Sequence, residues 1–390
     1  MQTMNIDYNH IFRQIADSLH HYYGLHVTVK IAYGADLFPK YNAVTTDGNI
    51  TYIIWFNPKV ETILSLYNRA MSDDEEIGEA VNRYMLFNAF LELDDYISAE
   101  RQLNVFRQEL DRLSLTHRTS ETQKEAEGQI LLQIYYILLH EAFHIIFKHS
   151  PESKAMAMAT THELLCDMKD ELTDQLSLIS NEELLSHPKT KEHLSALIPT
   201  SLPQEKREEM EAQLRKEMES HPYSTEYIDL LLHGEDEVLV EEMTCDRQAW
   251  LNLVSMIQDD GTTPEDLLEL HQWIFVVFCA MDFNHNLQAQ YRPSLHVKYE
   301  YDGRRVVFRH KAFKTLLRQY HPDTYRLVTT QYLDLNKGLE AIFSTSTLGI
   351  IKYQEDFALL YQIYQEKTNL PDLHRFQQLE KEMAEAADKL

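Results

Sequence analysis

The sequence predicts an α+β fold that is predominantly α, with a small N-terminal β-sheet, and three observations lead to this prediction. The 390 residues include only 10 Gly and 11 Pro and no Gly/Ser-rich run, which is typical of a compact, mostly helical chain. β-Branched runs on both sides of Asp47-Gly48 indicate a hairpin. One long apolar helix carries a HExxH pattern.

The N-terminal part, residues 1–150, is expected to hold this sheet beside the HExxH helix. Its expected elements are, in chain order, a helix over 8–24, strands over 26–32, 42–45 and 50–56, and helices over 57–70, 74–113 and 122–149. The Asp47-Gly48 pair is the predicted turn between the second and third strands. The sheet should therefore have about three strands.

Residues 151–224 are predicted to be a helical insertion, because they are rich in charged residues and helix formers. The charge run over 204–220 is interpreted as the solvated face of a helix. His162–Cys166 is a near miss of HExxH, with Cys in place of the second His, and is interpreted as part of an ordinary amphipathic helix. The insertion, over residues 151–221, is a possible contact surface for a protein partner.

The C-terminal part, residues 225–390, is predicted to be helical and to form one compact unit with the rest. Its expected elements are a helical pair over 225–257 broken near Gly234, a helix from Thr263-Pro264 to about 289, a hairpin over 296–308 around Asp302-Gly303, and an acidic amphipathic helix over 371–388.

Charge and cysteine content exclude several classes of protein. The net charge of −26 argues against binding to nucleic acid or to an anionic membrane. The three cysteines are far apart and contain no CxxC, so we expect reduced thiols in a cytoplasmic protein. The N-terminal residues have neither the basic start nor the apolar core of a secretory signal. The longest apolar run, 273–281, is about half of a membrane span.

His140, Glu141 and His144 form the HExxH pattern near the end of the 122–149 helix. On a helix the two histidines lie about 40° apart in azimuth and ~6 Å apart along the axis, so both imidazoles can reach one Zn²⁺. Glu141 lies about 100° around the helix from His140, where its carboxylate can hold a water and accept its proton. The pattern predicts a zinc site with Glu141 as general base.

The surroundings of the pattern favour a metal. Apolar residues cover nearly every side of this helix, which indicates that it is buried. One polar stripe, about 60° wide, runs along it through Gln133, His140, His144 and Lys148. Burying two imidazoles and a carboxylate is unfavourable unless a group such as a metal pairs them. The alternative is a pair of core histidines bonded to carbonyl groups, with a salt-bridged Glu141.

A zinc ion on HExxH needs a third protein ligand and an open position for water. The HExxHxxGxxH ligand set is excluded, because Phe147 stands where the glycine would be. Glu242 and Asp246 are four residues apart on a predicted helix, so one can bind the metal while the other accepts the Nδ1–H of a ligand histidine. Glu237 and Glu241 are the alternative ligands.

Two of the motifs resemble a known group of enzymes. The segment HEAFHIIFKHSP, residues 140–151, resembles the HExxH segment of gluzincin peptidases related to the CAAX-prenyl and HtpX-type enzymes. EMTCDRQA, residues 242–249, is similar to the Glu-x-x-Ala-Asp-x-x-Ala helix that supplies the third ligand there, with Cys245 replacing the small alanine. The resemblance implies a zincin-like fold with Glu242 on the zinc and Asp246 supporting a ligand.

A third motif, His321-Pro322 followed by Arg326, resembles a later His-Pro motif of that group, whose histidine can face the reacting carbonyl. A capping or turn role for His321 is the alternative. Soluble relatives of the group include the Lit-type phage-exclusion peptidases, which cut a host translation factor. The resemblance therefore implies a protein substrate in the cytoplasm and a role in phage defence.

Together these features predict a gluzincin-type zinc metalloendopeptidase that hydrolyses a peptide bond in a protein substrate. The predicted zinc ligands are His140, His144 and Glu242. Glu141 is the predicted general base, and His321 or a tyrosine is predicted to stabilise the oxyanion. An extended substrate is expected to add to an edge strand of the 26–56 sheet. The rival prediction is a non-catalytic helical interaction protein whose zinc site is structural or vestigial.

Overall fold

The structure is a computed structural model, and its helices and strands are described for most of the chain. It describes residues 8–32, 38–46, 49–71, 77–112, 120–178, 225–257, 262–292, 308–330, 352–366 and 369–387, together with positions 204, 207, 208 and 212. In this part helices dominate, and one three-stranded sheet lies near the N-terminus. The prediction of a predominantly α, α+β fold is confirmed.

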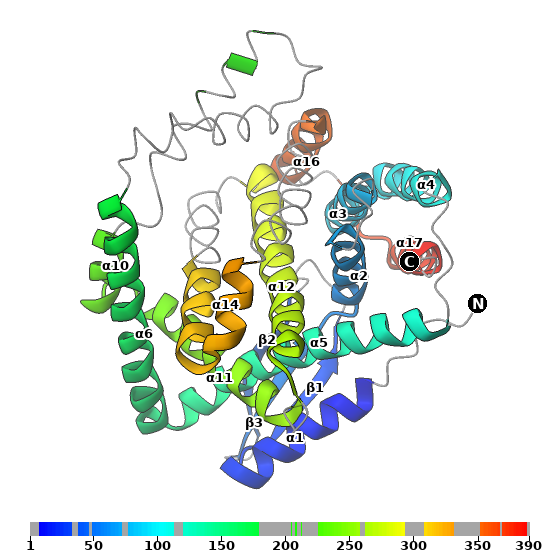
Figure 1. The fold of residues 1–390 in the computed structure, drawn as a ribbon. Coiled ribbons are helices and arrows are strands. Elements are labelled where there is room, and N and C mark those ends of the chain that lie inside the picture. Colours follow the sequence, from blue (N-terminus) through cyan, green and yellow to red (C-terminus); the bar gives the residue numbers. More distant parts are fainter. Residues whose placement is uncertain are drawn as a thin grey trace.

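The helices and strands follow one another as Figure 1 shows. They are α1 (Tyr8–Tyr23), β1 (Val27–Ile31), β2 (Lys40–Thr46), β3 (Asn49–Phe56), α2 (Lys59–Met71), α3 (Gly78–Glu92), α4 (Tyr96–Arg112), α5 (Ser120–His149), α6 (Pro151–Leu178), α10 (Thr225–Leu232), α11 (Glu237–Ile257), α12 (Pro264–Tyr291), α14 (Pro322–Thr330), α16 (Gln354–Glu366) and α17 (Leu373–Ala387). A further helix spans residues 308–320.

The sheet has the strand order β1-β3-β2, with β1 parallel and β2 antiparallel to the central strand β3. The three predicted strands are confirmed, and the Asp47-Gly48 turn lies outside the described residues. In the register, Val29 and Tyr41 flank Ile54, so these three side chains share one face. That face is the buried one, since Ile54 is fully buried, and β2 forms an edge of the described sheet.

One apolar core joins the N-terminal and C-terminal parts of the described chain. Helix α5 runs through this core and packs against α11, α6 and α1 (Figure 1). By length and composition alone α5 could cross a membrane over Lys124–His149, but 72% of its most apolar window is buried inside the protein. A core helix passes the same test, so the apolar character of α5 is accounted for by its packing.

Two predicted elements are corrected by the structure. The single helix expected over 74–113 is two helices, α3 and α4, that pack against each other. The break lies at Asp94, which adopts a left-handed backbone conformation (φ 58°) and accepts a 2.6 Å hydrogen bond from the Tyr96 hydroxyl. Phe308, expected at the end of a strand, lies in the 308–320 helix instead, and the rest of the predicted 296–308 hairpin lies outside the described residues.

Other sequence signals act as expected. Gly234, at φ +78°, ends the short helix α10 before α11 starts. Thr263 caps α12 in a reciprocal capping box with Asp266. Helix α6 begins the predicted insertion and exposes Cys166 while Leu165 packs in the core, as in an ordinary amphipathic helix. Most of the insertion beyond Leu178 lies outside the described residues.

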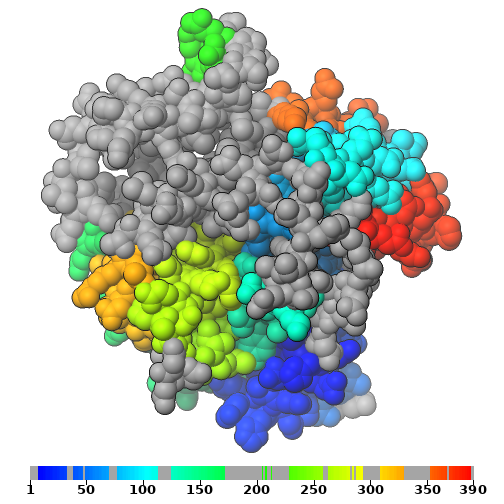
Figure 2. Space-filling view, turned by 45° about the vertical axis from the view of Figure 1, so that its right-hand side comes forward, coloured from blue at the N-terminus to red at the C-terminus, as the bar shows by residue number. Residues whose placement is uncertain are grey.

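The C-terminal helix α17 returns to the N-terminal half and packs along α4, as Figure 2 shows for the red and cyan segments. Arg107 of α4 and Glu382 of α17 form an ion pair at 3.2 Å across this contact. Asn369, ahead of α17, donates a 3.3 Å hydrogen bond to the Leu93 carbonyl. The C-terminal end of the described chain therefore packs on its N-terminal half. The predicted division at residues 150 and 224 stays a prediction.

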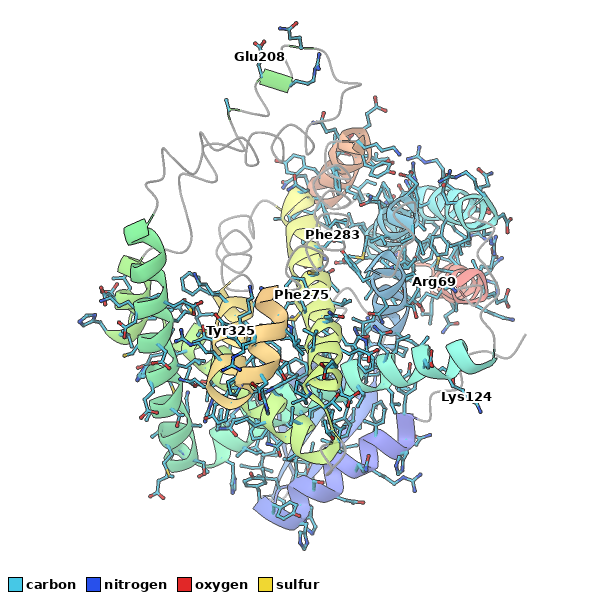
Figure 3. All side chains as sticks on the ribbon, in the orientation of Figure 1. Arg69, Lys124, Glu208, Phe275, Phe283 and Tyr325 are labelled. Atoms are coloured by element: carbon cyan, nitrogen blue, oxygen red, sulfur yellow. The ribbon has the colours of Figure 1, made fainter. Side chains whose placement is uncertain are left out.

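A buried histidine lies between α12 and the 308–320 helix. His271 is 3% exposed, stacks on Phe313 with the ring centroids 5.1 Å apart, and has no hydrogen-bond partner for either ring nitrogen among the described residues. Nearby, Phe275, labelled in Figure 3, contacts the ring of His310 at 4.0 Å. Burial lowers the pKa of His271 to about 3, and Lys314 has a smaller effect in the same direction. His271 is therefore neutral in the folded protein.

This pKa shift predicts a loss of stability in acid. Since the folded pKa lies below the unfolded value of about 6.5, the unfolded chain binds the extra proton and stability falls as the pH drops below 6.5. Between pH 7 and pH 5, His271 alone should remove about 2 kcal/mol from the free energy of unfolding. His271→Phe keeps the ring packing and should weaken this dependence. Chemical denaturation at both pH values tests it, and identical pH dependence in the two proteins would contradict it.

Candidate metal centre

The candidate site lies where α5 meets α11. His140 and His144 project from helix α5, which is buried around them: Leu138 and Ile145 of the same helix are fully buried in the core. Glu242 projects toward them from α11, which packs on α5. The sequence expectation that a second helix brings Glu242 to the histidines agrees with this placement.

Three potential ligand atoms converge on one point. Nε2 of His140 and Nε2 of His144 are 3.2 Å apart. The Glu242 carboxylate completes a triangle, with Oε2 3.2 Å from Nε2 of His140 and Oε1 3.2 Å from Nε2 of His144. Ligands bonded to a tetrahedral zinc at about 2.0–2.1 Å lie roughly 3.3 Å from one another. The two Nε2 atoms, and each Nε2 with the carboxylate oxygen nearest to it, are thus spaced as neighbouring zinc ligands are, and the three side chains form a group that could hold a metal ion.

The ring orientations fit the same ion. The Nδ1 atom of His140 lies 2.9 Å from Oδ1 of Asp246, and the Nδ1 atom of His144 lies 2.9 Å from Oε1 of Glu241. With the ring hydrogen of each histidine on Nδ1, the lone pair of each Nε2 is left on the side of the Glu242 carboxylate. Three acceptors then face one another, which is unfavourable unless a cation lies between them. Carboxylates behind both histidines are the usual support of metal-binding imidazoles.

The electrostatics of the cluster favour positive charge. Burial acts to raise the pKa of Glu242, but Arg309 and the two histidines hold that pKa well below its usual range, so the carboxylate is ionised. Burial acts to lower the pKa of His140, but the nearby Asp246 and Glu242 carboxylates raise it overall. A site with ionised carboxylates around two imidazoles binds a divalent cation favourably.

Glu241 and Glu237, the alternative third ligands, lie elsewhere. Glu241 faces the Nδ1 side of His144 and forms an ion pair with Lys154 of α6. Glu237 is exposed in the first turn of α11. Only Glu242 of the three directs its carboxylate to the Nε2 side of both histidines. The helix register therefore separates three nearby glutamates into different environments.

Arg309 is part of the site and was missed by the sequence analysis. Its guanidinium, 6% exposed, makes a bidentate contact with Asp246, with Nε 2.6 Å from Oδ2 and Nη2 2.7 Å from Oδ1. Its Nη1 lies 3.2 Å from Oε2 of Glu242. A buried carboxylate such as Asp246 needs a cationic partner. The sequence could not show that this partner is Arg309, because the chain has 36 Lys and Arg residues and their spacing does not tell which one reaches Asp246.

Two tyrosines also adjoin the site. Tyr136, one turn before His140 on α5, donates a 3.1 Å hydrogen bond to Oδ1 of Asp246. Tyr41 of β2 stacks on His144, with ring centroids 6.2 Å apart and an interplanar angle of 20°. The helical spacing of Tyr136 from His140 was a usable signal, whereas nothing in the sequence aligned Tyr41 with His144. These contacts place the edge strand β2 beside the candidate ligands.

Glu141 lies at the same end of α5 and is half-buried. Burial raises the pKa of Glu141, while the nearby His140 and His144 act to lower it. A raised pKa brings a carboxylate closer to the neutral pH at which a general base works best. Its position beside the cluster is compatible with the role predicted for it.

His321 lies away from the cluster. Its ring packs edge-on against Trp250, with the ring centroids 6.1 Å apart. Trp250 lies about two turns, or ~12 Å, along α11 from Glu242. Its carbonyl accepts the Tyr325 N–H at 2.9 Å at the start of α14. In the described part of the chain no contact joins His321 to the candidate ligands, and its predicted role toward the reacting carbonyl stays a prediction. The turn role was the alternative.

No protein-family model, curated protein or solved structure matches this chain. The resemblance to gluzincin peptidases therefore remains a prediction from short motifs, and so does the zincin-like fold. The geometry of the site is the evidence that remains for a function.

The first prediction from this geometry concerns zinc affinity. Glu242→Ala should abolish stoichiometric zinc binding, because it removes one of three ligands. Glu241→Ala and Asp246→Asn should each weaken binding about 10–100-fold, because each supports one histidine from behind. Glu237→Ala, on the exposed side of α11, is the control and should bind like wild type. Competition with a chelating dye measures each affinity. Metal loss in Glu241→Ala with retention in Glu242→Ala would reverse the assignment.

The second prediction concerns Arg309. Arg309→Met leaves the buried Asp246 carboxylate without its bidentate partner, so the free energy of unfolding should fall by about 3–5 kcal/mol. Arg326→Met removes an exposed ion pair with Asp323 and should cost less than about 1 kcal/mol. Denaturant unfolding in the presence of a chelator compares the two variants. Equal effects would show that the Arg309 contact contributes little to stability.

Proposed function

We propose that the protein is a zinc-dependent metallopeptidase that hydrolyses a peptide bond in a protein substrate. The observation that carries this proposal is the grouping of His140, His144 and Glu242: the two Nε2 atoms are 3.2 Å apart, and each lies 3.2 Å from a different oxygen of the Glu242 carboxylate. Two imidazoles and one carboxylate form a ligand set found at catalytic zinc, where three protein ligands leave a position open. Zinc, when bound, supplies Lewis acidity that lowers the pKa of a water toward neutrality.

Glu141 performs the proton transfers of the proposed reaction. Its carboxylate accepts a proton from the water as the water oxygen forms a bond to the carbonyl carbon. The same proton then passes to the leaving nitrogen as the C–N bond breaks, giving an amine and a new carboxyl group. The raised pKa that burial gives Glu141 suits a group that must both accept and return a proton.

The surrounding residues hold the ligands in place. Asp246 supports His140, and Arg309 and Tyr136 bind the same Asp246 carboxylate. Glu241 supports His144 and is itself held by Lys154. Each ligand histidine thus has a carboxylate behind it, and each carboxylate has a cation. Such support fixes the orientation of the rings before the metal arrives.

The proposed substrate is an extended peptide segment that adds to the edge of β2. Strand β2 pairs only with β3 in the described sheet, so alternate N–H and C=O groups on its other side are available for pairing. The stacking of Tyr41 on His144 puts this edge beside the candidate metal ligands. A cytoplasmic substrate and a role in phage defence belong to the proposal through the Lit-type resemblance alone.

Replacing the general base tests catalysis. Glu141→Gln keeps the side-chain shape but cannot accept a proton, so it should retain zinc and lose about 10²–10⁴-fold in rate. Wild-type protein expressed in cells should generate discrete cleavage products that the variant does not, and an untargeted comparison of protein termini detects them.

The rival function, a non-catalytic binder with a structural zinc site, gives a different result. A binder does not depend on a proton acceptor at the metal, so wild type and zinc-loaded Glu141→Gln would have equal cellular effects. Equal effects, with zinc bound in both proteins, would therefore contradict the peptidase proposal.

A further inference from the structure

Lys148 lies beside the candidate site and has no acidic partner among the described residues. Lys148 lies one turn after His144 on the same face of α5, and its ammonium is 5.6 Å from the ring centroid of Tyr41. Its side chain is exposed. Within the described residues this cation–π contact is the interaction that Lys148 makes, and no carboxylate lies within ion-pair distance of it.

Lys148 differs in this respect from Lys154, the other lysine beside the candidate site. Acidic residues outnumber basic ones by 62 to 36, and Lys154, the next lysine along the chain, is paired with Glu241. Lys148 is therefore a positive charge that a ligand can reach, held toward the edge strand by the Tyr41 ring.

The strand geometry decides which part of a substrate would meet this lysine. A segment that pairs with β2 places the side chain opposite Tyr41 on the same face of the sheet as Tyr41. On that face lie His144, through its stacked ring, and Lys148. A substrate side chain beside Tyr41 thus lies near both the candidate metal ligands and the Lys148 ammonium.

We propose that Lys148 is a specificity-determining residue that selects an acidic side chain, Asp or Glu, within about two residues of the scissile bond. The inference rests on the proposed peptidase function and names the substrate class for it. A carboxylate at this position would pair with Lys148, whereas a lysine or arginine would be repelled and an apolar side chain would leave the ammonium unpaired.

Cleavage-site profiling tests the proposal without a known substrate. A peptide library prepared from a cell lysate with chymotrypsin, which leaves acidic and basic residues inside the peptides, is incubated with zinc-loaded protein and sequenced by mass spectrometry. Wild type should show Asp and Glu enriched at one fixed position within two residues of the cut. Lys148→Met should lose that enrichment, and Lys148→Glu should replace it with Lys and Arg.

A control on the same helix separates local from general charge effects. Lys124 is exposed near the other end of α5, where Figure 3 labels it. The helical rise puts it ~36 Å along the axis from Lys148. Lys124→Glu changes the net charge by the same amount as Lys148→Glu and should keep the wild-type profile. An acidic preference that is absent, or that all variants share, would overturn the role of Lys148 while leaving the peptidase intact.

A binding measurement provides a second readout that does not depend on turnover. A peptide from the profile and its Glu→Gln or Asp→Asn twin are titrated calorimetrically into zinc-loaded Glu141→Gln protein. The acidic peptide should bind about three- to tenfold more tightly, and this difference should vanish when Lys148→Met is added. Equal affinities would contradict the inference. If no peptide is cleaved by zinc-loaded wild type, the proposed function fails first and the inference falls with it.

Discussion

The arrangement of the site depends on the Asp246 carboxylate. It is 3% exposed and is contacted by His140 and Tyr136 of α5 and by Arg309 of the 308–320 helix. A buried carboxylate needs such contacts, because an ion without them would be strongly destabilising. The guanidinium and the imidazole hold the pKa of Asp246 at about 2, against the effect of burial, so it stays ionised. Three helices are thereby fixed around the ligand histidines.

The same contacts make the ligand geometry available before a metal binds. Arg309 also reaches Glu242, so one guanidinium orients both the supporting carboxylate and the candidate third ligand. On the other side, Lys154 holds Glu241 against His144. Preorganisation of this kind reduces the entropic cost of ordering the ligand side chains when a metal binds. It also gives a physical reason for burying so many charges in one place.

The candidate centre and the sheet are coupled through α5. The helix places His144 beside the ring of Tyr41, and Lys148 one turn further along the same face. Since β2 is an edge strand of the described sheet, the extended substrate proposed above would lie next to these side chains. The carboxylates that hold the two histidines are on α11, whereas the proposed contacts with a substrate would be made by β2. Metal binding and substrate binding would therefore depend on different elements.

The sequence by itself determined the local structure and half of the site. Apolar periodicity predicted the helices, the Asp-Gly pair indicated the neighbouring strands, and the four-residue spacing of His140 and His144 put both on one helical face. Glu242 rested on a motif in which Glu241 remained an alternative. Only the tertiary structure placed Glu242, and not Glu241, on the Nε2 side of both histidines. It also placed Arg309 and Tyr41 at the site, although Arg309 follows His140 by 169 residues and Tyr41 precedes it by 99. Helical spacing acts over a few residues, whereas these contacts depend on how distant elements pack.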